Sequence, residues 1–462
     1  MIRWCAHRLT ALMTTAPRAG RAAWLAARTA LLGLLAGPLA LPAVPARAAT
    51  LRQVLGEVLA GNRDLEAQRW QAAAARARAV RAGSWESPVL EVGVENVPVT
   101  GRFDQDPMTM KVIGVTQRVP VFGANRIARR AENEQARADG LSLVALRWER
   151  AGDAWQAYAQ AYFAGTRAAA AEGHRGVMQR MVGAARARYE AGRGRLDDVL
   201  RAQAEAARVD ADAATWRAAE AEARARLAEL RGRSPTETIE ALESPPVLDV
   251  GADARPWIDA ALRHPRVLEQ DARGERYRMA ARAARRSAWP ELELRAAYGR
   301  RETLVNPIHG TAAEQDNMFS ATLGFTLPLF AGSREGAEAR EMDAMAHAAE
   351  AERGGAALAL EQAVVAAHAR ALAGSRTVRL IADTVLVLQQ RSLDAAWSAY
   401  AAGSADLMGV FETAHALYAE ELREADEREA LARADAQLIA LTGRLDLIGV
   451  SIPGATGGKD QR

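Results

Sequence analysis

The chain has 462 residues, of which 49% are hydrophobic and 25% are charged, so it is too polar throughout for a bundle of membrane-spanning helices. Its formal charge is +3, but the first 48 residues hold six arginines and no acid, and removing these six charges leaves −3. Binding a phosphate backbone needs a net basic surface or a concentrated basic patch, so this balance argues against a nucleic-acid partner.

Residues 1–48 have the pattern of a secretory signal peptide. A basic start is followed by an apolar stretch over residues 30–40 and by Ala46-Arg47-Ala48, after which we predict cleavage. The only cysteine, Cys5, lies in this segment, so we expect the exported chain to have no disulfide and no lipid-bearing cysteine. No later run of about 18 apolar residues predicts a membrane-spanning helix.

Residues 49–233 form the first of two predicted structural repeats. A helix is expected over Leu51–Gly83, with a local break at Asn62, and it leads into a hairpin over residues 88–120. In this hairpin Leu90, Val92 and Val94 alternate with polar residues, which is typical of a strand with one apolar face.

The second strand of this hairpin, Met108–Val119, alternates less regularly. Its phase slips near Ile113, which indicates either a β-bulge or a misplaced strand boundary. Pro88 and Pro120 bound the hairpin, where a residue without an N–H can end a helix or a ladder without leaving a donor unpaired.

Residues 254–445 repeat this order after a proline-containing linker over residues 234–253. The second hairpin, 290–328, alternates cleanly and is bounded by Pro290 and Pro328. Residues 446–462 are expected to be a flexible tail. The landmarks that match between the repeats, at a shift that grows from 202 to 211, are Ser87-Pro88 with Trp289-Pro290, Pro120-Val121-Phe122 with Pro328-Leu329-Phe330, Ala164-Gly165 with Ala373-Gly374, and Tyr189-Glu190-Ala191-Gly192 with Tyr400-Ala401-Ala402-Gly403.

A long helix follows each hairpin, over Gly123–Gly165 and Gly332–Gly374. At 1.5 Å per residue each would extend roughly 63 Å, which requires partner helices. We expect these helices to turn back at Gly165-Thr166-Arg167 and Gly374-Ser375-Arg376, and the returning stretches to be interrupted once at each Tyr-x-Ala-Gly landmark.

Neither hairpin has enough strands to bury its apolar face alone. Because lipid does not allow an open sheet edge, four strands from one chain must be completed by strands of other chains until a barrel closes. Strands of about ten residues also have the length that a tilted transmembrane strand needs.

The signal peptide, the duplicated helix–strand–strand–helix order and the paired Tyr-x-Ala-Gly landmarks resemble the TolC-like outer-membrane efflux factors. So do the strand ends Gln117-Arg118-Val119-Pro120-Val121-Phe122-Gly123 and Thr326-Leu327-Pro328-Leu329-Phe330-Ala331-Gly332. The resemblance implies a mainly α fold with a small β part. Long antiparallel helices would form a periplasmic α-barrel, and four strands per chain would contribute to a shared twelve-stranded transmembrane β-barrel in a homotrimer.

The resemblance further implies a passive exit duct in the outer membrane, docked on a periplasmic adaptor protein that belongs to an inner-membrane transporter. The segment Glu95–Gly123 is similar to the heavy-metal branch of this family, which serves resistance-nodulation-division pumps for copper, silver, cobalt, zinc or cadmium. A channel for drug efflux or type I protein secretion stays open as an alternative. A soluble periplasmic coiled-coil adaptor or structural protein is the alternative from another class, although it predicts strands gathered in one compact domain.

The predicted tips, Gly165-Thr166-Arg167 and Gly374-Ser375-Arg376, are the candidate docking sites for the adaptor, because arginine offers a rigid fork of donors to a partner's carboxylates or carbonyls. The plainer interpretation is a helix reversal without a partner. Glu172 and Asp383 are candidate gate charges for cations, although an ordinary exposed helix charge is the favoured interpretation. No catalytic residues, phosphate-binding loop or histidine pair at metal-ligand spacing stand out, so we predict no enzyme activity, no cofactor and no metal site.

Overall fold

The computed structural model describes residues 48–450, apart from residues 105, 238–239 and 306–308. The chain divides into two units, residues 1–48 and 49–462, and the second contains every described helix and strand. Apart from Ala48, the predicted signal peptide lies outside the described residues, as does the predicted tail after Val450.

The first repeat has the predicted order of helix, hairpin and long helices. Its helix is broken at Asn62 as predicted, because the side-chain oxygen of Asn62 accepts hydrogen bonds from the backbone N–H groups of Asp64 and Leu65 and so caps a new helix. The elements are α2 (Leu51–Gly61), α3 (Arg63–Gly83), β1 (Val89–Glu95), β2 (Met110–Val119), α4 (Ala124–Glu190) and α5 (Leu196–Leu230).

The second repeat follows the same order. Its first helix is also broken, at His264, where Nδ1 accepts a hydrogen bond from the backbone N–H of Arg266 at 3.1 Å. The elements are α6 (Arg255–Ala261), α7 (Pro265–Ser287), β3 (Leu292–Arg301), β4 (Leu304–Val305), β5 (Ala312–Ala313), β6 (Met318–Phe325), α8 (Glu335–Leu380), the π-helix η1 (Ile381–Val385), α9 (Leu386–Ala401), α10 (Leu407–Thr442) and the 3-10 helix η2 (Leu445–Ile448).

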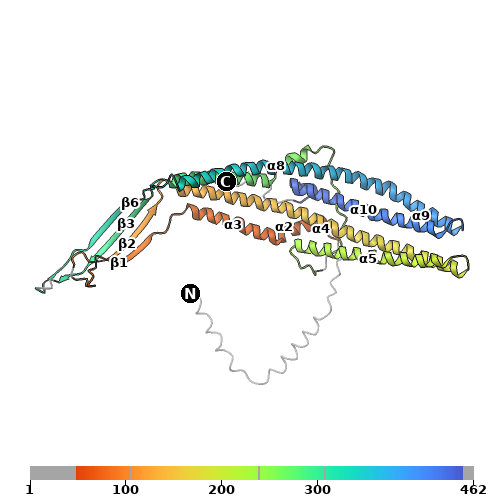
Figure 1. The fold of residues 1–462 in the computed structure, drawn as a ribbon, viewed down its shortest axis with the longest axis horizontal. Helices are drawn as coiled ribbons and strands as arrows, with labels where there is room; N and C mark the ends of the chain where they lie inside the picture. The colour runs from red at the N-terminus through yellow and green to blue at the C-terminus, as the bar shows by residue number, and fades with distance from the viewer. Residues whose placement is uncertain (1–47, 105, 238–239, 306–308, 451–462) are drawn as a thin grey trace, which may run out of the picture. The chain divides into compact units, whose positions relative to one another are not determined.

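The two hairpins join into one antiparallel sheet with the order β1-β2-β3-β6, so that β2 of the first repeat pairs with β3 of the second (Figure 1). The predicted bulge near Ile113 is wrong, because β2 pairs residue for residue with both neighbours: Ile113 lies opposite Val92 and Tyr298. The phase slip in the sequence arises because β2 carries β-branched residues on both faces, with Ile113 exposed and Val112 buried.

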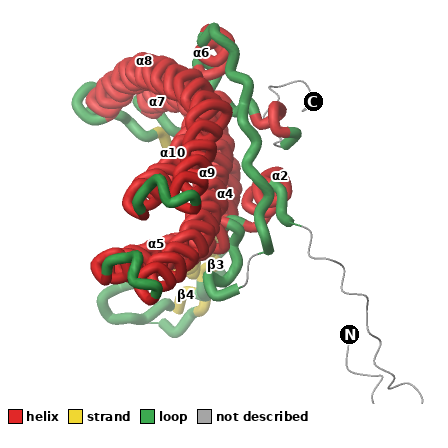
Figure 2. Tube along the Cα trace, turned by 90° about the vertical axis from the view of Figure 1, so that its right-hand side faces the viewer, coloured by secondary structure: helices red, strands yellow, loops and turns green. Residues whose placement is uncertain are grey.

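Helix α4 has 67 residues, about 100 Å at 1.5 Å per residue, and packs against α2, α3, α5, α7 and α10 (Figures 1 and 2). Small buried residues recur along it every seven positions, at Ala131, Ala138, Ala145, Gly152 and Ala159. They allow close helix contact: a Cβ on Gly152 would lie 2.8 Å from the Cβ of Ala440 in α10. The predicted fold class, mainly α with a small β part, is therefore confirmed.

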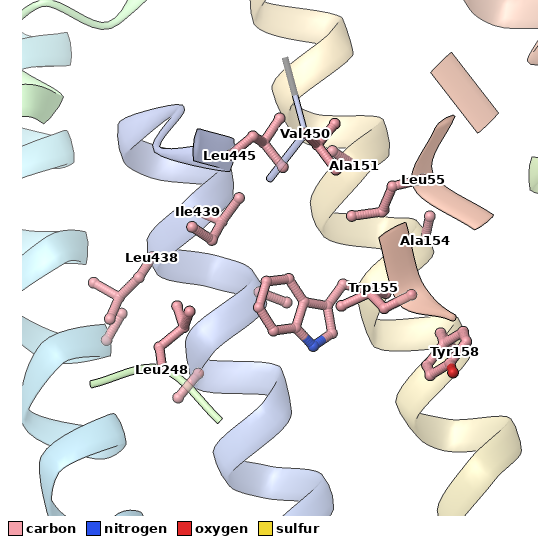
Figure 3. Close-up of a cluster of buried hydrophobic side chains, with 14 of the residues drawn as sticks. Leu55, Ala151, Ala154, Trp155, Tyr158, Leu248, Leu438, Ile439, Leu445 and Val450 are labelled. Carbon is pink, nitrogen blue, oxygen red and sulfur yellow. The ribbon is translucent and has the colours of Figure 1, made fainter. Parts of the chain in front are cut away.

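The largest hydrophobic core joins both repeats around Trp155 of α4 (Figure 3). Leu248 of the linker and Ile439 of α10 belong to it, and so do Leu445 and Val450. The prediction of a flexible tail from residue 446 is therefore wrong for residues 446–450, because η2 returns apolar side chains to the core.

Candidate functional site

The sheet has one apolar and one polar face. The apolar face is exposed within the described chain: 75% of Val92 and 73% of Phe319 are accessible to solvent. Side chains that alternate with it along the strands form the opposite face, where Arg295 pairs with Glu91 at 2.9 Å and with Glu95 at 3.5 Å. A sheet of this kind is suited to separate an apolar medium from water.

The sheet also has two free edges within the described chain. Strand β1 pairs only with β2, and β6 pairs only with β3. The unpaired N–H and C=O groups along a free edge are a template for pairing with another strand.

The two long helical hairpins reverse at the Tyr-x-Ala-Gly landmarks. Helix α4 ends at Glu190 and α5 begins at Leu196, while α9 ends at Ala401 and α10 begins at Leu407. The prediction that the helices turn at Gly165-Thr166-Arg167 and Gly374-Ser375-Arg376, and that the landmarks interrupt the returning helices, is wrong.

Both reversals are closed by the same backbone motif. Gly192 and Gly403 have φ angles of 68° and 74°, a left-handed conformation that disfavours residues with a Cβ. The N–H of Arg193 donates to the Arg188 carbonyl at 2.9 Å, and the N–H of Ser404 donates to the Ala399 carbonyl at 3.0 Å, as in a Schellman cap. These bonds satisfy carbonyls at the ends of α4 and α9.

The two turns contact each other through Arg188 and Tyr400. The Arg188 guanidinium lies 4.9 Å from the centre of the Tyr400 ring, and Asp406 caps α10 by accepting the Gly409 N–H at 3.1 Å. A cavity of about 160 Å³ between the turns is also lined by Asp198. We call residues 188–198 and 400–407 the helical tip. The sequence signal for it was present, since each glycine is followed closely by a helix-starting acidic residue, Asp197 or Asp406.

The first predicted site instead lies inside α4. Gly165 packs beside Glu220 of α5, and the Thr166 hydroxyl donates to the Tyr162 carbonyl at 3.1 Å. The Arg167 side chain is buried and binds Asp426 at 2.6 Å and Glu429 at 2.7 Å, both in α10. Arg167 therefore ties the two hairpins together and is not presented to a partner.

The second predicted site lies inside α8. Gly374 packs against Leu431 of α10, with a Cβ position 3.5 Å from that side chain, and the Ser375 hydroxyl donates to the Leu372 carbonyl at 3.0 Å. Arg376 is exposed. A helix accommodates glycine at a cost of about 1 kcal/mol, so neither Gly-Thr-Arg nor Gly-Ser-Arg has to form a turn.

The predicted gate charges, Glu172 and Asp383, are both exposed. Glu172 pairs with Arg217 of α5. Asp383 lies in the π-helix η1 of the second repeat, where Tyr400 follows Arg376 by 24 positions. In the first repeat Tyr189 follows Arg167 by 22 positions. The π turn accommodates additional residues without ending the helix.

The four predicted junction prolines lie beside the sheet. Pro88 directly precedes β1 and Pro290 lies two residues before β3, while Pro120 directly follows β2 and Pro328 lies three residues after β6.

A larger cavity, of about 580 Å³, lies between α5 and α10 and is lined by Met178, Glu205 and His415. Beside it the ring of His174 stacks on Tyr418 at 4.4 Å, and burial lowers the pKa of His174 to about 4. Among the described residues no three His, Cys, Asp or Glu side chains are grouped so that they could hold a metal ion. None of the described helices is both long and apolar enough to cross a membrane.

Comparison with known proteins identifies the family. The family model for outer membrane efflux proteins matches residues 54–233 and 258–444. A search of curated protein sequences found no significant relative.

Solved structures with a similar fold include those of OprN, CusC and VceC. The outer-membrane channel OprN is 19% identical, with a TM-score of 0.70 over 85% of this chain and 89% of OprN. CusC, whose structures concern transmembrane channel formation, is 17% identical, with a TM-score of 0.69 over 85% of this chain and 91% of CusC. The outer membrane protein VceC of Vibrio cholerae is 18% identical, with a TM-score of 0.69 over 85% of this chain and 96% of VceC. The chain therefore belongs to the outer membrane efflux protein family, and its function is that of the outer-membrane channel in a tripartite efflux system.

Proposed function

We propose that three copies of this channel close into one passive duct in the outer membrane, with no catalytic activity of its own. The observation that carries the proposal is the four-stranded sheet with a free edge on each side and an exposed apolar face. Three such sheets, paired β1 to β6 between copies, would make a twelve-stranded barrel without edges. The ion-paired face with Arg295 and Glu91 would then line a water-filled lumen.

Disulfide cross-linking between copies tests this assembly. The chain after residue 48 has no cysteine, so cysteines can be introduced in pairs along β1 and β6 without background. We expect covalent trimers on denaturing gels from pairs in one register, and ion-conducting pores in planar bilayers. A monomer with no cross-linked product and no conductance would refute the proposal.

We further propose that the helical tip binds the periplasmic adaptor, which in turn belongs to an inner-membrane transporter. Support comes from two similar turns that adjoin one another, with exposed Leu196 and Leu200 beside the arginines of the first turn. Leu196→Glu with Leu200→Glu is expected to weaken co-purification of the adaptor of the same efflux system. The matched change Leu358→Glu, at an exposed position of α8, is expected to leave it unchanged. Equal retention of the adaptor by both variants would contradict docking at this tip.

For the exported substrate we propose heavy-metal cations. Support is the similarity of Glu95–Gly123 to the heavy-metal branch, and the test is the growth of a strain lacking this chain. We expect increased sensitivity to copper, silver, cobalt, zinc or cadmium and unchanged sensitivity to drugs. Drug sensitivity or loss of a secreted protein would instead favour the alternative channel functions.

A further inference from the structure

Exposed aromatic and aliphatic side chains gather at the junction between the sheet and the long helices. Figure 1 shows this junction, where the strands meet the ends of the helices. The apolar face of the sheet continues into this junction at Val121 and Leu327, which follow Val119 and Phe325 at two-residue spacing. Phe330 is 79% exposed and Trp85 is 63% exposed. Large apolar side chains are left open here, although the helical core lies close by.

Contacts within the junction connect its separate segments. The rings of Phe122 and Trp289 lie 5.0 Å apart and bring the start of α4 to the end of α7. The Asn125 side chain donates to the Ser84 carbonyl at 3.1 Å, and the Thr326 N–H donates to the Glu291 carbonyl at 3.0 Å. The exposed rings therefore lie together at the end of the helices that adjoins the sheet.

Arginines flank these rings on the helical side. The Arg286 guanidinium lies 5.4 Å from the centre of the Trp289 ring. Arg126 lies in the first turn of α4, four residues after Phe122, and Arg130 lies one helical turn further. The stem of Arg129 packs against Gly83, two residues before Trp85, so closely that a Cβ on Gly83 would lie 2.6 Å from its Cδ.

These arginines are exposed, and among the described residues no carboxylate lies within ion-pair distance of them, whereas the nearby Arg285 pairs with Asp343. The segments 81–88, 118–130, 282–291 and 326–335 contain nine arginines and three glutamates, a net charge of +6 in a chain whose charge after residue 48 is −3. The positive charge is therefore concentrated at this level.

We propose that this belt, formed by Trp85, Phe122, Trp289 and Phe330 with Arg126, Arg129, Arg130 and Arg286, binds anionic phospholipid headgroups in the periplasmic leaflet of the outer membrane. The inference rests on the proposed membrane assembly, in which the sheet ends at this leaflet. Aromatic rings partition to the level of the headgroups, while arginine stems reach along apolar surface and present guanidinium groups to phosphate oxygens. Unpaired arginines at this level favour an anionic over a zwitterionic lipid.

Native mass spectrometry of the intact channel tests this proposal. Phosphatidylglycerol and phosphatidylethanolamine with the same acyl chains are added to wild type, to the belt variant Arg126→Gln/Arg130→Gln/Arg286→Gln, and to the control variant Arg180→Gln/Arg193→Gln/Arg391→Gln. The control removes the same charge from exposed positions of α4, the first turn and α9. We expect the belt variant to bind phosphatidylglycerol roughly 100-fold more weakly, about fivefold per arginine, and the control to bind as wild type does.

The proposal is overturned if the belt variant keeps its preference for phosphatidylglycerol or the control loses it equally. Displacement of the lipid by inorganic phosphate would also overturn it, because a simple anion site needs no membrane. Conductance in bilayers of phosphatidylcholine separates this proposal from the assembly itself. A conducting wild-type trimer without lipid preference refutes only the belt, whereas the absence of trimers and conductance refutes the proposed function.

Discussion

Replacing Asp435 with asparagine should remove a pH-dependent loss of stability at the contact between the linker and α10. Asp435 of α10 is fully buried, and its Oδ2 accepts the backbone N–H of linker residue Leu248 at 3.1 Å, while its Oδ1 has no partner among the described residues. Burial raises the pKa of this carboxyl from 3.8 to about 7, because the charged form loses its hydration.

The sign of the effect follows from proton binding. Opening means that the linker around Leu248 leaves α10 and exposes Asp435 to water. Between about pH 4 and pH 7 Asp435 is protonated while the linker is packed on α10 and deprotonated once it has opened. The free energy of opening therefore falls as the pH rises through this range and is constant above about pH 7. A shift from 3.8 to about 7 corresponds to about 4 kcal/mol at most, or up to roughly 1000-fold in the opening equilibrium. Asp435→Asn keeps an acceptor for the Leu248 N–H but does not ionise.

Hydrogen exchange of the peptide that contains Leu248, measured by mass spectrometry at pH 5 and pH 8 and corrected for the intrinsic rate, reports this opening. We expect wild type to lose protection at pH 8 and Asp435→Asn to keep it, with a smaller difference between them at pH 5. Glu412→Gln, an exposed position of the same helix, is the control and should behave as wild type. Identical pH dependence in wild type and Asp435→Asn would refute the reasoning.

Three further predictions concern the folding free energy, measured by urea unfolding. Arg167→Met should cost about 1–3 kcal/mol because it removes the charged hydrogen bonds of a buried guanidinium to exposed Asp426 and to Glu429, which keeps its pair with Arg433, whereas Arg376→Met, at the exposed counterpart, should change stability by less than about 0.5 kcal/mol; equal losses would contradict the bridging role of Arg167. Gly192→Ala should cost about 1–2 kcal/mol through its left-handed φ, while Gly173→Ala, within α4 and with open space around it, should stabilise by up to about 1 kcal/mol; a stabilising Gly192→Ala would rule out the turn described here. Burial lowers the pKa of His264 to about 4, so between about pH 6.5 and 4 the unfolded chain binds a proton that the folded chain does not, and the free energy of unfolding decreases as the pH is lowered. His264→Asn should keep the helix cap and reduce this decrease. An acid dependence of stability that is the same in both proteins would exclude His264 as its source.

Local patterns determined the elements of this chain. Alternation along Leu292–Arg301 is enough to predict a strand with one apolar face, because side chains of a strand point alternately to its two faces. The break at Asn62 was equally visible, because asparagine caps a helix from within its own segment. The repeated landmarks also predicted two similar halves before any contact between them was known.

Long-range contacts decided how those elements pack, pair and bury their polar side chains. Gly-Thr-Arg at 165–167 looked like a turn, but the acids that hold Arg167 inside a continuous helix lie 259 and 262 positions away, beyond any local pattern. The joining of both hairpins through β2 and β3, and the burial that raises the pKa of Asp435, likewise depend on residues of the other repeat or the linker. The sequence by itself determined which segments are helix and strand, because propensity and periodicity act over a few residues. Only the tertiary structure decided which of the two glycine landmarks in each repeat ends the helix, because packing between distant segments outweighs the small local cost of a glycine inside a helix.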